Sequence, residues 1–157
     1  MIYRHIVIPL DGSELAESVL PHLAGFTPDP QTQVDLVRAV PPVEIHYRAV
    51  VPLDTGNERQ LNEFALKEAR DYLEKTKTKL PTAYTNVRAQ ILQGRPADVI
   101  ADYLNTSGAD LLLMATHGRS GPSRWIWGST AEKLLRSTCI PVFLVHPPGC
   151  GARPEGR

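Results

Sequence analysis

A set of five short apolar runs most limits the possible folds of this chain. Four segments with helical periodicity separate them. The runs are His5–Leu10, Val34–Val40, Val87–Ile91, Asp110–Ala115 and Pro141–Val145. Runs of this length bounded by Gly, Pro or Asp are typical of buried strands, whereas apolar residues three and four apart are typical of helices. Regular alternation of strand and helix predicts a parallel sheet covered by helices on both faces.

The helical segments have recognisable first and last residues. Helices are expected at about Ser13–Gly25, Asn57–Lys79, Pro96–Leu104 and Gly128–Ser137. Ser13 and Asn57 are predicted N-caps, and Pro96 suits a first helical turn. In the second helix the apolar face is predicted to include Leu61, Phe64, Ala65, Ala69, Tyr72 and Leu73. Cys139, beside the last apolar run, is expected to be a buried small hydrophobic residue.

We therefore predict one doubly wound, Rossmann-like α/β domain with a five-stranded parallel sheet in the order 3-2-1-4-5. The domain is expected to span residues 1–147, and residues 148–157, which lack apolar periodicity, to form a disordered tail. Ligands of such sheets bind beyond the carboxyl ends of the strands where the order reverses, here between the first and fourth strands. The loops at that point are Asp11–Ser13 and Thr116–Ser129.

Composition excludes several function classes. The 157 residues include 17 Lys plus Arg and 17 Asp plus Glu, and a net charge of zero attracts neither a nucleic acid nor an anionic membrane. No stretch approaches the roughly 20 apolar residues that span a bilayer. The start of the chain lacks the features of a signal sequence. With two cysteines and no metal-ligand spacing, the chain is expected to be cytoplasmic, without a disulfide framework or a metal site.

The segment between the fourth run and the last helix carries the strongest functional signal. Its glycines are Gly118, Gly121 and Gly128, and its arginines are Arg119 and Arg124. The hydroxyl residues Ser129 and Thr130 open the helix that follows. Glycines permit backbone turns that aim successive N–H groups at one anion. The amides and the dipole at a helix N-terminus also favour phosphate, and hydroxyls and guanidinium groups add donors. The segment therefore predicts a phosphate site.

A surface loop with turning glycines, followed by Ser129 as an ordinary N-cap, is the alternative interpretation. The position after a central strand favours the phosphate site. The segment is not a Walker A loop, because no lysine follows Gly128. His117 has no carboxylate or nucleophile that the sequence places beside it, so we interpret it as an exposed loop histidine rather than a general base.

Three blocks of the sequence resemble the universal stress protein family. They are IVIPLDGSELAE, LQGRPADVI and ADLLLMATHGRSGPSRWIWGSTAEKLLRSTCIPVFLV. Nucleotide-binding members of that family share the pattern Gly, two residues, Gly, nine residues, Gly, then Ser or Thr. Gly118, residues 119–127, Gly128 and Ser129 match this pattern. Ala115 stands where the first glycine is expected and adds a methyl group where ribose or phosphate would pack.

The resemblance implies an adenine-nucleotide-binding, homodimeric regulatory module of a stress response. The implied ligand is ATP, with Mg²⁺ as a companion ion, and ADP and AMP are alternatives. Asp11 is then expected to bond the nucleoside end, Val40 to meet adenine through its backbone, and the glycine loop and the hydroxyl residues to hold phosphate. The predicted binding residues are Pro9, Asp11, Val40, Ala115, Gly118, Arg119, Gly121, Gly128, Ser129 and Thr130. The last strand, Val142–Val145, is expected to lie at the sheet edge and to pair two copies.

The residues by themselves leave alternatives open. A carboxylate such as Asp11 can accept bonds from ribose hydroxyls, and it can also bond its own backbone in a turn. Val40 equally fits plain core packing. A dimeric interaction module that binds no nucleotide is a second candidate function, for which Ala115 is the reason, and a slow ATPase is a third. No catalytic residue is predicted, because the SGG-x-D-S and HIGH motifs are absent and no acid pair suited to two-metal hydrolysis stands out.

Overall fold

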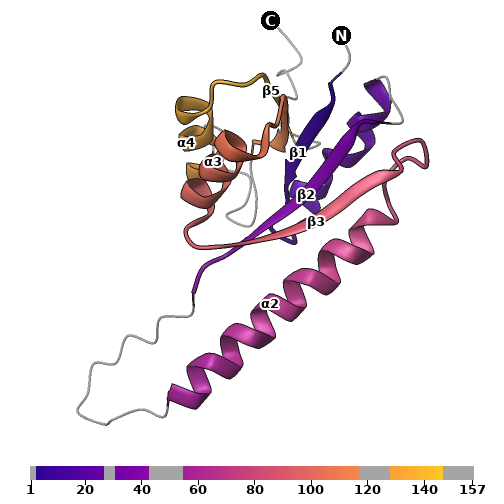
Figure 1. The fold of residues 1–157 in the computed structure, drawn as a ribbon. Helices are drawn as coiled ribbons and strands as arrows, with labels where there is room; N and C mark the ends of the chain where they lie inside the picture. Colours follow the sequence, from indigo (N-terminus) through magenta and orange to yellow (C-terminus); the bar gives the residue numbers. More distant parts are fainter. Residues whose placement is uncertain (1–2, 27–30, 43–54, 117–127, 147–157) are drawn as a thin grey trace, which may run out of the picture.

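A five-stranded parallel sheet forms the centre of the computed structural model (Figure 1). The strand order β3-β2-β1-β4-β5 confirms the predicted doubly wound α/β fold. The strands are β1 (His5–Pro9), β2 (Gln33–Val40), β3 (Asn86–Gln93), β4 (Leu111–Ala115) and β5 (Val142–Val145). The structure describes residues 3–26, 31–42, 55–116 and 128–146, with only the backbone of 55–57, so the predicted tail at 148–157 lies outside the described residues.

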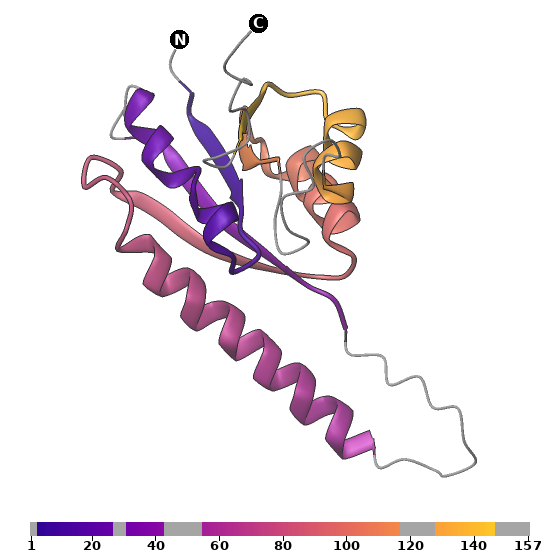
Figure 2. The ribbon, with the colours of Figure 1, turned by 180° about the vertical axis from the view of Figure 1, so that it is seen from behind.

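Helices cover both faces of this sheet (Figures 1 and 2). They are α1 (Glu14–Glu17), the 3-10 helix η1 (Leu20–Gly25), α2 (Thr55–Lys77), α3 (Pro96–Ser107) and α4 (Ser129–Ser137). Buried residues of α1, η1 and α2 form one core with the sheet. Those of α3 and α4 form a second core on the opposite face. The chain is therefore a three-layer α/β/α structure.

Alternating side chains of β4 enter both cores. Leu111 and Leu113 belong to the core beneath α1 and α2, whereas Leu112 and Met114 belong to the core beneath α3 and α4. All of β4 is buried, and each fully buried Leu contributes about 1.5–3 kcal/mol. Because β4 pairs with β1, the carboxyl ends of these two strands are held side by side at the centre of the sheet.

The first helical segment is not the single helix that the sequence predicts. Ser13 is the N-cap as expected, and its Oγ accepts from the Ala16 amide at 3.1 Å. However, α1 ends at Glu17, and a 3-10 helix begins at Leu20. Pro21 explains the break, because it has no N–H to donate to the Glu17 carbonyl and its ring clashes with that carbonyl in a continuous helix.

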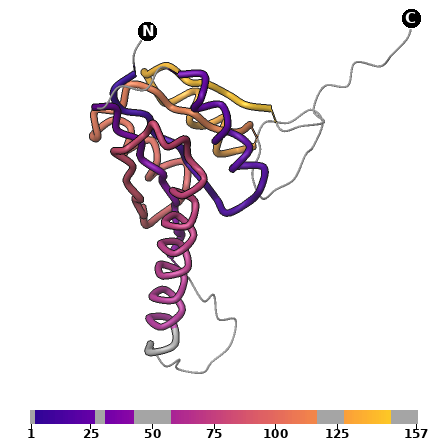
Figure 3. The backbone as a smooth tube through the Cα atoms, turned by 90° about the vertical axis from the view of Figure 1, so that its right-hand side faces the viewer, coloured from indigo at the N-terminus to yellow at the C-terminus, as the bar shows by residue number. Residues whose placement is uncertain are grey.

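The prediction that Leu61 and Phe64 lie in the buried face of α2 is wrong. Their exposed fractions are 48% and 69%, whereas Ala69 and Leu73, farther along the same helix, are fully buried. Figure 3 shows the reason: the amino-terminal part of α2 extends beyond the sheet, so no strand lies beneath it. Only the carboxyl-terminal half of α2 has the sheet to pack on.

The prediction that Cys139 is buried is also wrong, because the side chain is exposed. Cys139 belongs to the connection between α4 and β5, and β5 begins only at Val142. In this connection Ile140 rather than Cys139 packs against the core beneath α3 and α4. Among the described helices, none combines the length and apolar character that crossing a bilayer requires.

Candidate functional site

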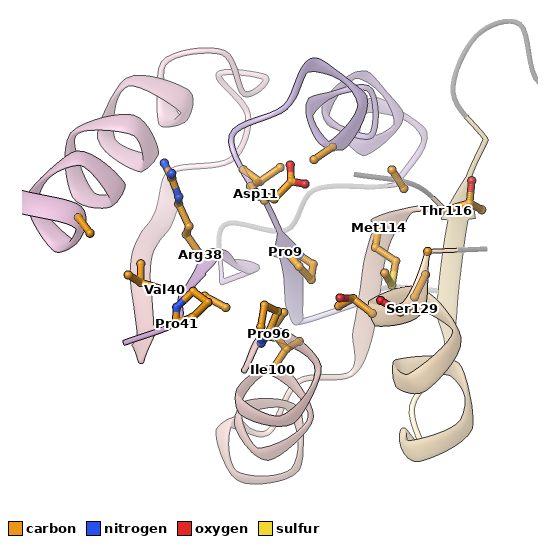
Figure 4. A pocket seen from close by; sticks show the side chains of 18 of the residues that line it. Pro9, Asp11, Arg38, Val40, Pro41, Pro96, Ile100, Met114, Thr116 and Ser129 are labelled. Carbon is orange, nitrogen blue, oxygen red and sulfur yellow. The ribbon is translucent and has the colours of Figure 1, made fainter. Parts of the chain in front are cut away.

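A pocket of about 550 Å³ lies beyond the carboxyl ends of β1, β2 and β4, where the strand order reverses (Figure 4). This volume lies within the range of small-molecule sites, about 300–1,000 Å³. The pocket brings together seven of the ten residues predicted from the sequence, which are Pro9, Asp11, Val40, Ala115, Gly128, Ser129 and Thr130. The other three, Gly118, Arg119 and Gly121, lie outside the described residues, as do Arg124 and His117.

A tight turn after β1 positions Asp11 at the pocket. The Asp11 Oδ1 atom accepts from the Ser13 amide at 2.9 Å and from the Ser13 hydroxyl at 2.6 Å. Gly12, between them, has φ +89°, a conformation that favours glycine. The turn role considered from the sequence is therefore present, and the same carboxylate also lines the pocket. Burial and Glu17 raise the pKa of Tyr72, and the negative charge of Asp11 adds to this shift.

The amino end of α4 forms the opposite side of the pocket (Figure 4). Gly128 is the N-cap, with φ −57° and ψ 141°, and it supplies no side-chain cap. Its amide donates to the Thr116 carbonyl at 3.0 Å, which ties the start of α4 to the end of β4. The first N–H groups of a helix have no carbonyl partner within the helix. This end of the pocket is therefore suited to an anion, with the Ser129 and Thr130 hydroxyls beside it.

Ala115, the last residue of β4, is one of the residues that line the pocket. Its side chain is buried and belongs to the core beneath α1 and α2. The next residue, Thr116, is held by β5, because its amide donates to the Val145 carbonyl at 3.0 Å. The position of Ala115 is therefore fixed by the sheet.

Val40 ends β2 and lines the pocket beside Pro41. Its carbonyl accepts from the Gly94 amide at 3.0 Å. Gly94 has φ +139°, and an added Cβ would lie 2.5 Å from the Cγ1 atom of Val99, so this turn requires glycine. The turn directs the chain into α3, whose first residue, Pro96, also lines the pocket.

Two charged residues of the pocket were missed by the sequence reasoning. Arg38 of β2 and Glu68 of α2 both line it, and their side chains are joined by a 3.2 Å bond from Nη2 to Oε1. The available signal was a lone arginine inside the apolar run VDLVRAV. Nothing in the sequence indicated that α2 would supply its partner.

The described residues contain no group of three or more His, Cys, Asp or Glu side chains that could hold a metal ion. The described part of the pocket lining instead combines two carboxylates, one guanidinium, hydroxyls and the helix start with apolar side chains from both faces of the sheet. Such a lining suits an elongated ligand with an apolar part and an anionic end.

The profile of the universal stress protein family matches residues 2–146. The universal stress protein MJ0531 of Methanocaldococcus jannaschii is 27% identical over 147 residues, which are 94% of this chain and 84% of that protein. The universal stress protein MJ0577 of the same organism is 26% identical over 155 residues, covering 92% and 96% of the two chains. The structure of MJ0577 superposes with a TM-score of 0.76 at 24% identity, covering 93% of this chain and 97% of that one.

Two further solved structures of similar fold contain a nucleotide. One is a universal stress protein in complex with cAMP, with a TM-score of 0.59, 18% identity and coverage of 93% and 98%. The other is an Arabidopsis thaliana protein of the same family with AMP bound, with a TM-score of 0.58, 15% identity and coverage of 92% and 92%. At these identities the likeness concerns the fold.

Proposed function

Because this chain belongs to the universal stress protein family, we propose that it binds an adenine nucleotide, ATP in the first place, in the pocket between Asp11 and the start of α4. One observation carries the proposal: a single pocket joins a carboxylate after β1 to the amides and hydroxyls that open α4. The first suits ribose and the second suits phosphate. The AMP and cAMP complexes of proteins with this fold support the choice of an adenine nucleotide.

In this proposal the ligand lies across the carboxyl ends of the strands. The nucleoside lies between Asp11 and Val40, and the phosphates lie against Gly128, Ser129 and Thr130. Pro9 and Ala115, which line the same pocket, would lie beside the ligand. From the sequence pattern, Gly118, Arg119 and Gly121 complete the phosphate side. ADP and AMP are alternative ligands, and Mg²⁺ would accompany a triphosphate.

We further propose that the protein is a cytoplasmic, homodimeric regulatory module of a stress response, with residues 1–147 as its domain. The dimer would form through β5, which is the last strand of the sheet. The side chain of Phe143 on this strand is 41% exposed, and an apolar edge strand favours pairing with another chain.

Calorimetric titration of nucleotide-stripped protein with ATP, ADP and AMP tests the ligand. We expect a one-to-one isotherm and a rise of the thermal midpoint as ligand is added. Neither heat nor a midpoint shift at millimolar nucleotide would reject the proposal. Mass spectrometry of small molecules that copurify with the native protein identifies which nucleotide it carries.

An interaction module that binds no nucleotide is the second candidate. Ala115, which lines the pocket at the position where the family's binding pattern has glycine, is the observation that favours it. Replacing this residue with glycine distinguishes the two candidates.

A further inference from the structure

Arg38 and Glu68 form a charged pair on the pocket wall, outside the set of residues that the family resemblance implies. Arg38 lies on β2 two residues before Val40, and Glu68 lies on α2. The Nη2 atom of Arg38 is 3.2 Å from Oε1 of Glu68, and both residues line the pocket. Figure 4 shows the Arg38 side chain rising from β2 on the side of α2.

The Arg38 guanidinium is buried and has few polar partners among the described residues. Its side chain is 9% exposed and packs over the Tyr72 ring, with Cζ 4.9 Å from the ring centroid. A guanidinium carries five N–H donors, and within the described part of the chain its side chain makes one hydrogen bond, to Glu68. Buried polar groups are normally hydrogen-bonded. A ligand in the pocket can satisfy the remaining donors.

Glu68 retains capacity as an acceptor. Its side chain is 57% exposed, and an ionised carboxylate has about four acceptor positions on its two oxygens. The pair therefore presents N–H donors beside carboxylate acceptors on one wall of the pocket. This pattern fits a neutral group that has an acceptor beside a donor.

The pair lies at the nucleoside end of the proposed ligand. Arg38 and Val40 point to the same face of β2, about 7 Å apart along the strand. The phosphates are proposed at the other end, at Ser129. The carboxylates of Asp11 and Glu68 line the same pocket as Arg38, which disfavours a second anionic group beside it. The group that Arg38 meets is therefore the base.

We propose that Arg38 and Glu68 select adenine, with Arg38 donating to a ring nitrogen and Glu68 accepting from the neighbouring exocyclic amino group. This inference rests on the proposed function and adds to it a specificity for the base. Adenine presents an amino donor beside a ring-nitrogen acceptor. In hypoxanthine a carbonyl oxygen replaces the amino group, and a base held in the same place would set that oxygen against the Glu68 carboxylate.

Calorimetric titrations of AMP and IMP test this selection. The wild type should bind AMP about 10- to 100-fold more tightly than IMP, the range expected for a hydrogen bond to a charged group. In Glu68→Gln, whose amide can also donate, the affinity for AMP should fall and that for IMP should rise. Arg136→Met, which breaks the exposed pair with Glu132 on α4, is the matched control and should leave both affinities unchanged.

The 1-deaza and 7-deaza analogues of AMP test the contact of Arg38. Each lacks one ring nitrogen beside the amino group, so one of them should bind the wild type more weakly than AMP. In Arg38→Met, which keeps the packing on Tyr72 but has no donor, that penalty should vanish. The loss in Arg38→Met should be equal for adenosine, AMP and ATP.

The outcomes separate this inference from the proposed function. If the preference for AMP over IMP is unchanged in Glu68→Gln, or if the deaza penalty persists in Arg38→Met, the inference is wrong although the protein binds nucleotides. If the loss of affinity in Arg38→Met grows with the number of phosphates on the ligand, Arg38 contacts the phosphates, and the inference is wrong in that case too. If the wild type binds no nucleotide, the proposed function itself fails. Should Arg38→Met not fold, the ratio of the AMP and IMP affinities in Glu68→Gln, a change at a side chain that is 57% exposed, decides the inference.

Discussion

The hydroxyl of Tyr103 on α3 donates a 2.6 Å hydrogen bond to Oδ2 of Asp35 on β2. The Asp35 side chain is fully buried. The Nε2 atom of Gln33 lies 3.0 Å from each Asp35 oxygen, and Nε2 of His5 lies 2.6 Å from Oδ2. This cluster joins the first residues of β1 and β2 to α3, the helix whose amino end lines the pocket.

Replacing Tyr103 with phenylalanine should destabilise the fold. The change removes a donor from a buried carboxylate, so we expect a loss of about 1.5–3 kcal/mol in the free energy of unfolding. Urea denaturation followed by circular dichroism measures it. Tyr3→Phe is the control, because within the described residues no hydrogen bond of the Tyr3 hydroxyl is found, and it should change stability by less than about 0.5 kcal/mol. Equal losses in both variants would contradict the role of the Asp35 contact.

The same variant should change how stability depends on alkaline pH. Burial, followed by the hydrogen bond to Asp35 and its charge, raises the pKa of Tyr103. A raised pKa favours the neutral phenol in the fold, so this stability is complete below the unfolded pKa of about 10 and is lost as pH rises toward the folded pKa. Tyr103→Phe should therefore lose stability less steeply than the wild type between about pH 10 and 11. Urea midpoints across this range measure the difference, and some slope should remain because burial also raises the pKa of Tyr72 and Tyr84.

Asp110→Ala should loosen the pairing of β1 with β4. The Asp110 carboxylate accepts from the Arg4 amide at 2.8 Å and from the His5 amide at 2.9 Å. Losing both bonds should cost about 2 kcal/mol in the free energy of unfolding. Asp102→Ala, an exposed position on α3, is the matched control. Hydrogen exchange should show faster exchange of the β1 amides in Asp110→Ala only, and unchanged exchange would refute the prediction.

Ala115→Gly should raise the affinity for ATP. The substitution removes a buried methyl group at a residue that lines the pocket and restores the glycine of the family's binding pattern. It should also lower the free energy of unfolding by about 1 kcal/mol, because glycine weakens a strand. Ala109→Gly, a buried alanine that does not line the pocket, should weaken the fold without changing the affinity. Calorimetric titration separates the outcomes: a large gain means that the natural site is impaired, and no gain means that the methyl group is tolerated.

Leu144→Pro should abolish the proposed dimer. The Pro141 carbonyl accepts from Leu112 on β4, and the Val145 carbonyl accepts from Thr116, the residue after β4. The backbone groups of Leu144, on the alternate side, therefore point away from the sheet. Proline removes the N–H that an added strand would bond. Light scattering should show a monomer for Leu144→Pro and a dimer for Leu144→Ala, which loses the same side-chain packing but keeps the N–H. A dimer in both variants, or a wild-type monomer, would rule out pairing through this edge.

The strand order and the meeting of Asp11 with Ser129 could be predicted from the sequence for a physical reason. Asp11 follows the first apolar run, and Ser129 ends the loop that follows the fourth run. Parallel strands bring their carboxyl ends to one edge of the sheet. Residues 11 and 129 therefore needed only the strand order to be placed in one pocket. That prediction used periodicity and chain direction, which are local properties of the sequence.

The failures have equally specific causes. The break in the first helical segment is encoded by Pro21, which has no N–H to donate to the Glu17 carbonyl. The exposure of Phe64 depends on how far α2 extends beyond the sheet, and periodicity carries no information about that length. In the sequence Arg38 is a single arginine in an apolar strand, and only the folded structure places Tyr72 and Glu68 of α2 beside it. Such contacts between distant elements cannot be derived from the pattern of one segment.

The pocket wall includes Glu68 from the layer on one face of the sheet and Ile100 and Ala131 from the layer on the other. A molecule bound there would contact all three layers at once. Its binding free energy then opposes the departure of either outer layer from the sheet. Ligand binding would therefore slow hydrogen exchange far from the ligand, in both of the apolar cores that lie on opposite faces of the sheet.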